Sequence, residues 1–176
     1  MPISSVCPRL QSLVDLSTPR VNPIRLVVFD PRVQHLQMLL AGLQPNIQAH
    51  VLAPERDGID QVSALLCKLP TAELTLVTTG FSGGLCLGAS RLELSSLPEY
   101  EHQLRGWFVG VESPELSLLS GGVAKGVKGQ EFIAQLTSIT GAVVRASAQP
   151  IGQGHWLTAT AKKFKTVVIK TNSATL

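Results

Sequence analysis

Short, continuously apolar runs alternate along this chain with segments in which apolar residues recur every three or four positions. The first kind of segment predicts buried strands, and the second predicts amphipathic helices. The expected strands are 24–29, 47–52, 74–79, 116–120 and 142–146. The apolar positions of the expected helices are Val33, Leu36, Leu39, Leu40 and Leu43; Ile59, Val62, Leu65, Leu66 and Leu69; Tyr100, Leu104, Trp107 and Phe108; and Phe132, Ile133, Leu136 and Ile139.

Capping residues mark where several of these helices begin and end. Asp30 followed by Pro31 predicts an N-cap and first helical residue directly after the first strand. Asp57 is expected to cap the second helix, and Gly141 to close the last one. Two antiparallel features are also expected, a small hairpin over 85–94 around Gly88 and a terminal strand pair formed by 155–160 and 165–170.

Alternation of apolar strands with helices predicts an α/β fold, a three-layer sandwich with a mostly parallel central sheet covered by helices on both faces. The C-terminal antiparallel pair would extend it. Right-handed crossovers limit the topology. An outward step from the first strand to the second, and a return to the third, would place the topological switch point between the first and third strands. We expect residues 1–23 to be an extended lead-in, 24–170 to be one domain, and 171–176 to be a tail or the start of a linker.

Composition narrows the functional classes. The 176 residues carry a net charge of only +3, with Lys and Arg scattered, which argues against nucleic-acid binding. No apolar run approaches the ~18 residues of a membrane span, and the first residues lack the apolar core of a cleavable signal peptide. Cys7, Cys67 and Cys86 have no spacing typical of a zinc or redox motif. We therefore expect no cofactor, no metal and no direct membrane insertion.

The candidate site lies where the first, third and fourth strands end, because α/β folds bind ligands at the carboxyl ends of their strands. Its expected pocket residues are Asp30, Thr78, Gly80, Ser82, Cys86, Ser120 and Gly121. The ends of the third and fourth strands offer threonine, serine and glycine, with no histidine or carboxylate for acid-base chemistry. The site therefore has a predicted place but no evident chemistry.

Three patterns at this edge keep other functions open. Ser82 lies in a Gly-x-Ser-x-Gly sequence, which is typical of a nucleophile elbow, and a triad with Glu112 or Glu115 and His155 can be written. That motif requires a helix directly after the serine, whereas the following residues predict strands. Cys86 is a second candidate nucleophile, for a cysteine hydrolase. The glycine-rich segment 121–129, between a strand and a helix, is a candidate site for an anion or nucleotide.

Segments 52–62, 80–92, 121–129 with Phe132, and 140–147 through 154–156 resemble one family in the same order. It is the domain of unknown function found near the N-terminus of large bacterial, often cyanobacterial, surface proteins with cadherin-like or haemolysin-type calcium-binding repeats. The resemblance covers about residues 24–160. It allows a surface or secreted parent protein, and the sequence itself leaves the location unknown.

The same family looks like a relative of the caspase and gingipain clan. The resemblance implies a histidine after the third strand and a cysteine after the fourth, at positions where this chain has Thr79 and Gly122. Neither replacement can rebuild a thiolate–imidazole pair. The resemblance therefore implies a pseudoenzyme, a catalytically inactive caspase-like domain that serves as a binding, assembly or attachment module with a protein partner.

Overall fold

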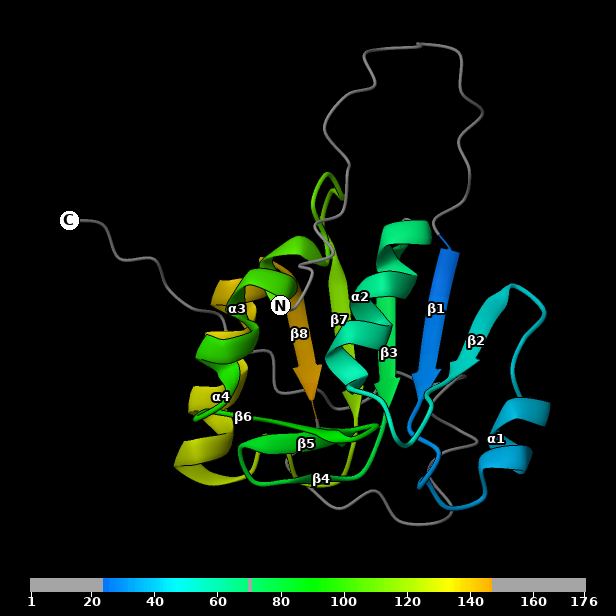
Figure 1. Ribbon diagram of the computed structural model, residues 1–176, viewed down its shortest axis with the longest axis horizontal. Coiled ribbons are helices and arrows are strands. Elements are labelled where there is room, and N and C mark those ends of the chain that lie inside the picture. The colour runs from blue at the N-terminus through cyan, green and yellow to red at the C-terminus, as the bar shows by residue number, and fades with distance from the viewer. Residues whose placement is uncertain (1–23, 70, 147–176) are drawn as a thin grey trace, which may run out of the picture.

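The computed structural model describes residues 24–69 and 71–146, which form two sheets and four helices (Figure 1). In chain order the elements are β1 (Ile24–Phe29), α1 (Leu36–Ala41), β2 (Ile47–Val51), α2 (Gly58–Lys68), β3 (Thr71–Val77), β4 (Gly80–Phe81), β5 (Gly84–Leu87), β6 (Ser90–Glu93), α3 (Leu97–Gly106), β7 (Glu115–Leu119), α4 (Gly126–Thr140) and β8 (Val143–Ala146). The predicted lead-in 1–23, the terminal strand pair and the tail 171–176 lie outside the described residues.

The central sheet has the strand order β2-β1-β3-β7-β8, and every neighbouring pair is parallel. The predicted α/β class with a mostly parallel sheet flanked by helices is therefore confirmed. Successive strands run outward from β1 to β2 and then return to β3 on the other side of β1. The switch point lies between β1 and β3, as the sequence predicts, and their carboxyl ends meet at one edge.

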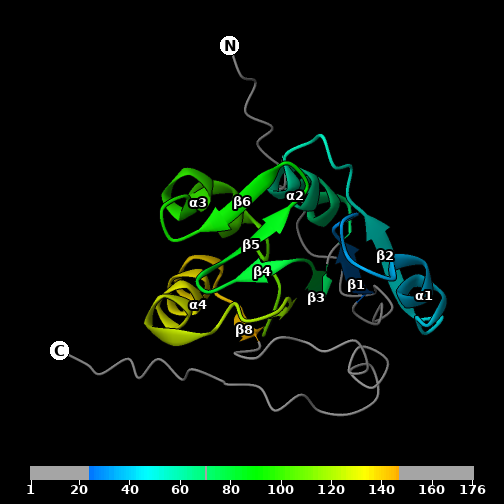
Figure 2. The same cartoon turned by 90° about the horizontal axis from the view of Figure 1, so that it is seen from below.

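Helices cover the two faces of this sheet unequally (Figure 2). Helices α2, α3 and α4 lie on one face, where Leu26, Leu74 and Leu116 from three adjacent strands are at most 1 % exposed. Short α1 lies on the other face and packs on a smaller cluster that contains Phe29 and Val77. Most of the core therefore lies between the sheet and the three-helix layer.

A second sheet, β4-β5-β6, crosses the carboxyl ends of β3 and β7 (Figure 1). Its strands are antiparallel, and the pairing of Leu87 with Ser90 leaves Gly88 and Ala89 as a two-residue turn. The predicted hairpin around Gly88 is confirmed, whereas the short strand β4 has no counterpart in the prediction. Alternation along β5 and β6 turns Leu85, Leu87 and Leu92 inward, where they join the main core.

Two of the three predicted caps are confirmed. Asp57 accepts hydrogen bonds from the backbone N–H groups of Ile59 and Asp60 at the start of α2. Gly141 adopts a left-handed φ of 68° after α4. The prediction for Asp30 as an N-cap is wrong, because α1 begins six residues later at Leu36 and has no side-chain cap. The carboxylate of Asp30 is instead buried and bonded elsewhere.

Candidate functional site

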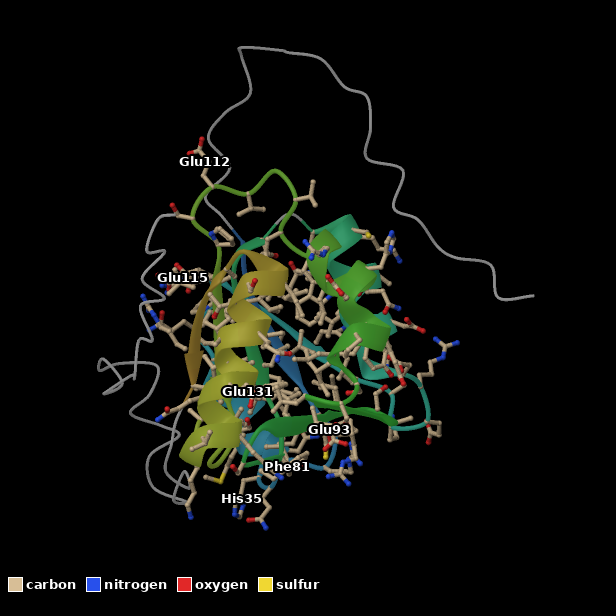
Figure 3. All side chains as sticks on the ribbon, turned by 90° about the vertical axis from the view of Figure 1, so that its left-hand side faces the viewer. His35, Phe81, Glu93, Glu112, Glu115 and Glu131 are labelled. Atoms are coloured by element: carbon tan, nitrogen blue, oxygen red, sulfur yellow. The ribbon has the colours of Figure 1, made fainter. Side chains whose placement is uncertain are left out.

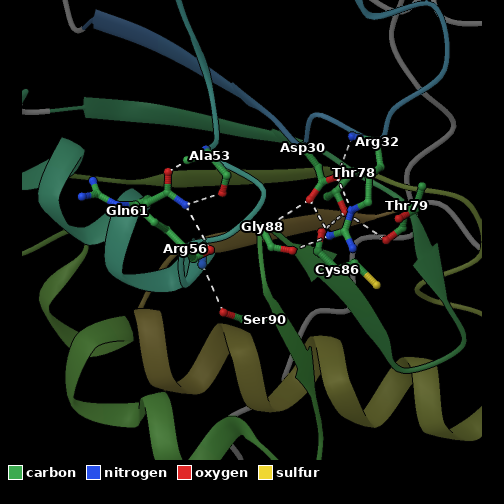
Figure 4. A network of polar contacts seen from close by, with 11 residues as sticks. Asp30, Arg32, Ala53, Arg56, Gln61, Thr78, Thr79, Cys86, Gly88 and Ser90 are labelled. Carbon is green, nitrogen blue, oxygen red and sulfur yellow. Dashed lines mark hydrogen bonds and ion pairs between the residues drawn. The ribbon is translucent and has the colours of Figure 1, made fainter.

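Asp30 follows the last residue of β1 and is completely buried. Its Oδ1 accepts hydrogen bonds from the backbone N–H and the Nε–H of Arg32, both at 2.9 Å. Its Oδ2 accepts from Arg32 Nη2 at 2.9 Å and from the Gly88 N–H at 2.8 Å. Arg32 Nη2 also donates to the Gly88 carbonyl at 2.5 Å. This Asp30 network ties the end of β1 to the β5–β6 turn (Figure 4).

The same contacts set the charge of the network. Burial raises the pKa of Asp30, but the hydrogen bonds from Arg32 and Gly88 outweigh it and hold that pKa below its ordinary value. The hydrogen bond to Asp30 likewise raises the pKa of Arg32. Both groups are therefore charged at neutral pH. The carboxylate is engaged on both oxygens, which suits a structural tie better than a general base.

Gly88 also rests on the loop that precedes α2. A Cβ atom at this position would lie 2.4 Å from the Arg56 carbonyl oxygen, and its φ of 54° disfavours other residues. The next residue, Ala89, donates its N–H to the same carbonyl at 2.8 Å. The Gln61 side chain braces the loop by bonding both the N–H and the carbonyl of Ala53. The β5–β6 turn is therefore held by the Asp30 network on one side and by the loop before α2 on the other.

Hydrogen bonds join the end of β3 to β5. The Cys86 N–H donates to the Thr79 carbonyl at 2.9 Å, and the buried Thr78 hydroxyl lies 2.5 Å from the Cys86 carbonyl. The half-buried Cys86 side chain lies beside Arg32 (Figure 4). It also pairs across the strands with Arg91 of β6. The sequence places no cationic residue next to Cys86, so its proximity to these two arginines is evident only from the structure.

Tight packing fills the space between the ends of β3 and β7. A Cβ at Gly80 would lie 2.7 Å from Ser120 Oγ, so only glycine allows this approach. Ser120 is completely buried, and its hydroxyl has no hydrogen-bond partner in the part of the chain that the structure describes. Gly121 and Gly122 follow it and are half-buried. Asp30, Thr78, Gly80, Cys86 and Ser120 are thus brought together at one edge.

Ser82 lies apart from this group, in the β4–β5 turn. Its side chain is exposed and donates a hydrogen bond to the Lys125 carbonyl at 2.6 Å. Strand β5 follows it where a nucleophile elbow requires a helix, so the elbow interpretation is wrong. Glu112 and Glu115 lie at the opposite end of the sheet from Phe81 (Figure 3). The third member of the written triad, His155, lies outside the described residues.

In the glycine-rich segment 121–129, residues 121–125 connect β7 to α4, as predicted, whereas 126–129 already form the first turn of α4. Gly129 packs against backbone atoms of Val123 and Ala124, and a Cβ added there would lie 2.5 Å from the nearest of them. Close backbone contact therefore accounts for this glycine. Lys125 and Lys128 are exposed. Anion or nucleotide binding at this loop stays a prediction.

Two further observations limit the chemistry of the described residues. Within 24–69 and 71–146, no group of three or more His, Cys, Asp or Glu side chains is placed to hold a metal ion. Among the helices of the same residues, none has both the length and the apolar character needed to cross a bilayer.

Fold and site together define an α/β domain with a parallel central sheet whose carboxyl edge is closed by a small antiparallel sheet. The chain belongs to the family described as "Domain of unknown function (DUF4347)", whose model matches residues 26–175. The match includes nearly all of the described fold and continues beyond it. A search of curated proteins found no match.

Proposed function

We propose that this chain is a catalytically inactive, caspase-like domain that acts as a binding, assembly or attachment module in a larger protein or complex. The main support is what stands at the two strand ends where the resemblance expects a catalytic pair. Thr79, exposed after β3, replaces the histidine, and Gly122, after β7, replaces the cysteine. Neither a hydroxyl nor a hydrogen atom supplies a nucleophile–base pair.

The backbone at Gly122 adds to this support. Its φ of 74° is left-handed, and nothing lies within 4 Å of the place that a Cβ would take. A cysteine would therefore meet no clash, but the backbone would cost about 1 kcal/mol relative to glycine. The loop after β7 has a shape that glycine favours.

The two other candidate nucleophiles, Ser82 and Cys86, have no hydrogen-bonded base among residues 24–69 and 71–146. In the described part of the chain, no imidazole is hydrogen bonded to Ser82 or Cys86, and Ser82 is already bonded to a carbonyl. The polar groups of Asp30 and Thr78 are satisfied within the fold. The edge is built to hold the β5–β6 turn in place, which suits a stable surface for binding.

Covalent probes test the inactive state. We expect a serine-directed fluorophosphonate and a peptidyl thiol-directed inhibitor to label the purified chain no faster than they label it after denaturation. The matched controls are Ser82→Ala and Cys86→Ala. Fast labelling of the folded chain that is lost in one of these variants would contradict the proposal and identify the nucleophile.

A cysteine hydrolase is the second candidate, because the fold places Cys86 beside two arginines. Its half-buried side chain lies next to Arg32 and opposite Arg91. This candidate requires a base that approaches Cys86, and labelling by the thiol-directed probe would favour it.

The binding role needs its own experiment. Crosslinking followed by affinity capture from the native source, with the intact chain as bait, should recover a defined protein partner in a constant ratio. Recovery that heat denaturation of the bait does not reduce would contradict a folded binding module.

A further inference from the structure

Five residues of β4, β6 and the start of α4 define what we call the β4–α4 surface: Phe81, Arg91, Lys125, Val127 and Lys128. The Arg91 guanidinium lies 4.6 Å from the centre of the Phe81 ring. Next to Phe81, Ser82 bonds the Lys125 carbonyl, and a Cβ added at Gly83 would lie 3.1 Å from the Lys128 carbonyl oxygen. These contacts of the β4–β5 turn bring the backbone at the start of α4 close to Phe81 and Arg91.

Several of these side chains face solvent. Val127 is 80 % exposed, more than any other large hydrophobic residue in the described part of the chain. Helix α4 buries its opposite side through Phe132, Ile133 and Leu136. An apolar side chain this exposed offers contact area to a partner, and Lys125 and Lys128 flank it in the sequence.

Charge on this surface differs from that of the rest of the fold. Between residues 24 and 146 the sequence has eleven Asp and Glu but only nine Lys and Arg, so this part of the chain is acidic. The β4–α4 surface itself contributes three cations. Glu93, 3.9 Å from Arg91, and Glu131 on α4 border it and restrict where an anionic group can bind.

The geometry points to the β4–α4 surface as the docking site for an acidic segment of a partner protein, an inference that rests on the proposed binding function. Carboxylates of the segment bind the guanidinium of Arg91 and the ammonium groups of Lys125 and Lys128. Apolar side chains between them pack on Val127 and on Phe81.

A polyanion fits this surface less well. Nucleic acid gains its affinity by neutralising many phosphates at once, whereas this surface offers three cations with two carboxylates beside them. Recruitment to anionic membranes typically uses about four to eight basic residues. A few separate carboxylates on a peptide match the number of cations on this surface.

The test is fluorescence anisotropy with the intact 176-residue chain and a labelled peptide of about twelve residues in which Glu alternates with Leu. We expect saturable binding that weakens at least tenfold when every Glu is replaced by Gln, and that weakens as salt rises. Arg91→Glu, and Lys125→Glu with Lys128→Glu, should each weaken binding at least tenfold. Val127→Ser should weaken it about threefold.

Arg105→Glu is the matched control, because Arg105 is equally exposed but lies on α3. It makes the same charge change and should leave binding within twofold. Thermal unfolding of each variant shows that the fold is retained. Equal losses in the control and the surface variants, no binding of the acidic peptide, or equal binding of the Gln peptide would each overturn the inference.

A twenty-base oligonucleotide and vesicles containing phosphatidylserine complete the test. Tighter binding of either than of the acidic peptide would also overturn the inference, by assigning the surface to a nucleic acid or a membrane. If the variants still capture the native partner in full, the docking site is wrong while the proposed binding function stands.

Discussion

Asp30 is bonded to a turn that lies 58 residues further along the chain, through the N–H of Gly88. Arg32 supplies the opposite charge and also bonds the Gly88 carbonyl. A buried carboxylate needs such partners, because leaving it unpaired would be costly. These three residues, together with the hydrogen bonds between Cys86 and the end of β3, therefore hold the small sheet on the large one.

The change Asp30→Asn keeps the shape but removes the charge. An amide nitrogen in place of one oxygen faces donors of Arg32 or Gly88, so at least two hydrogen bonds are lost. Because Arg32 is half exposed and can be solvated, we expect a loss of about 2–4 kcal/mol in the free energy of unfolding. Urea denaturation at pH 7 measures it, and a loss below about 1 kcal/mol would contradict the structural role.

The Asp30→Asn variant also tests how the stability of the fold depends on pH. Hydrogen bonds lower the pKa of Asp30 below its ordinary 3.8, so its contribution is present at neutral pH and lost as the pH falls through the lowered value. Between about pH 5 and pH 2, the wild-type chain should therefore lose more stability than Asp30→Asn. Parallel stability curves for the two proteins would show that Asp30 is not the titrating group.

Substitutions at Gly88 and Gly110 separate the cost of a positive φ from the cost of a steric clash at the Cβ. Both have positive φ, 54° and 76°, but only Gly88 has atoms close to the place that a Cβ would take. Gly110→Ala should cost about 1 kcal/mol through backbone strain alone. Gly88→Ala should cost at least about 1 kcal/mol more, because the Arg56 carbonyl lies in the way. Equal losses of stability for the two variants in thermal unfolding would argue against close packing of the β5–β6 turn on the Arg56 carbonyl.

At the scale of elements, Asp57 joins two helices. It caps α2 through the N–H groups of Ile59 and Asp60, and its Oδ2 accepts a 2.7 Å hydrogen bond from the Tyr100 hydroxyl on α3. Burial raises the pKa of Asp57, but hydrogen bonds from the Ser90 and Tyr100 hydroxyls and from the two N–H groups outweigh it and lower that pKa. The cap therefore also positions α3 against α2.

Replacing Asp57 should accordingly cost more than losing a cap. We expect Asp57→Ala to destabilise the fold by about 2–3 kcal/mol, since a cap contributes about 1 kcal/mol and the Tyr100 hydroxyl loses its partner. Asp60→Ala, in the same first turn, loses only an exposed hydrogen bond from Gln103 of α3, so as the control it should change stability by less than about 1 kcal/mol. Chemical denaturation of both variants measures the free energy of unfolding. Similar losses for the two variants would contradict the link between α2 and α3 through Asp57 and Tyr100.

Local patterns predicted most of these elements, and long-range partners explain where prediction failed. Strand β1 and the caps at Asp57 and Gly141 follow from nearby residues, so the sequence predicts them well. Asp30 carries a local helix signal, but its side chain is bonded to Gly88, a partner that no local pattern indicates. Cys86 likewise meets Arg32 only after the sheets assemble.

For the whole molecule, the strand order brings the ends of β1, β3 and β7 to one edge, and the β4–β6 sheet closes it. The parallel sheet agrees with the predicted fold class, and the family match extends over most of the chain. Thr79 and Gly122 stand where the resemblance expects a reactive pair. Under the proposed function, the fold is retained around two positions that no longer support the chemistry.

The most direct test of the inactive domain is peptide hydrolysis by the purified chain across a broad substrate library. We expect no cleavage above that of a Ser82→Ala, Cys86→Ala double variant. Turnover that is lost with either single substitution would assign the chain to the hydrolases. Robust turnover that survives both substitutions would equally contradict an inactive domain.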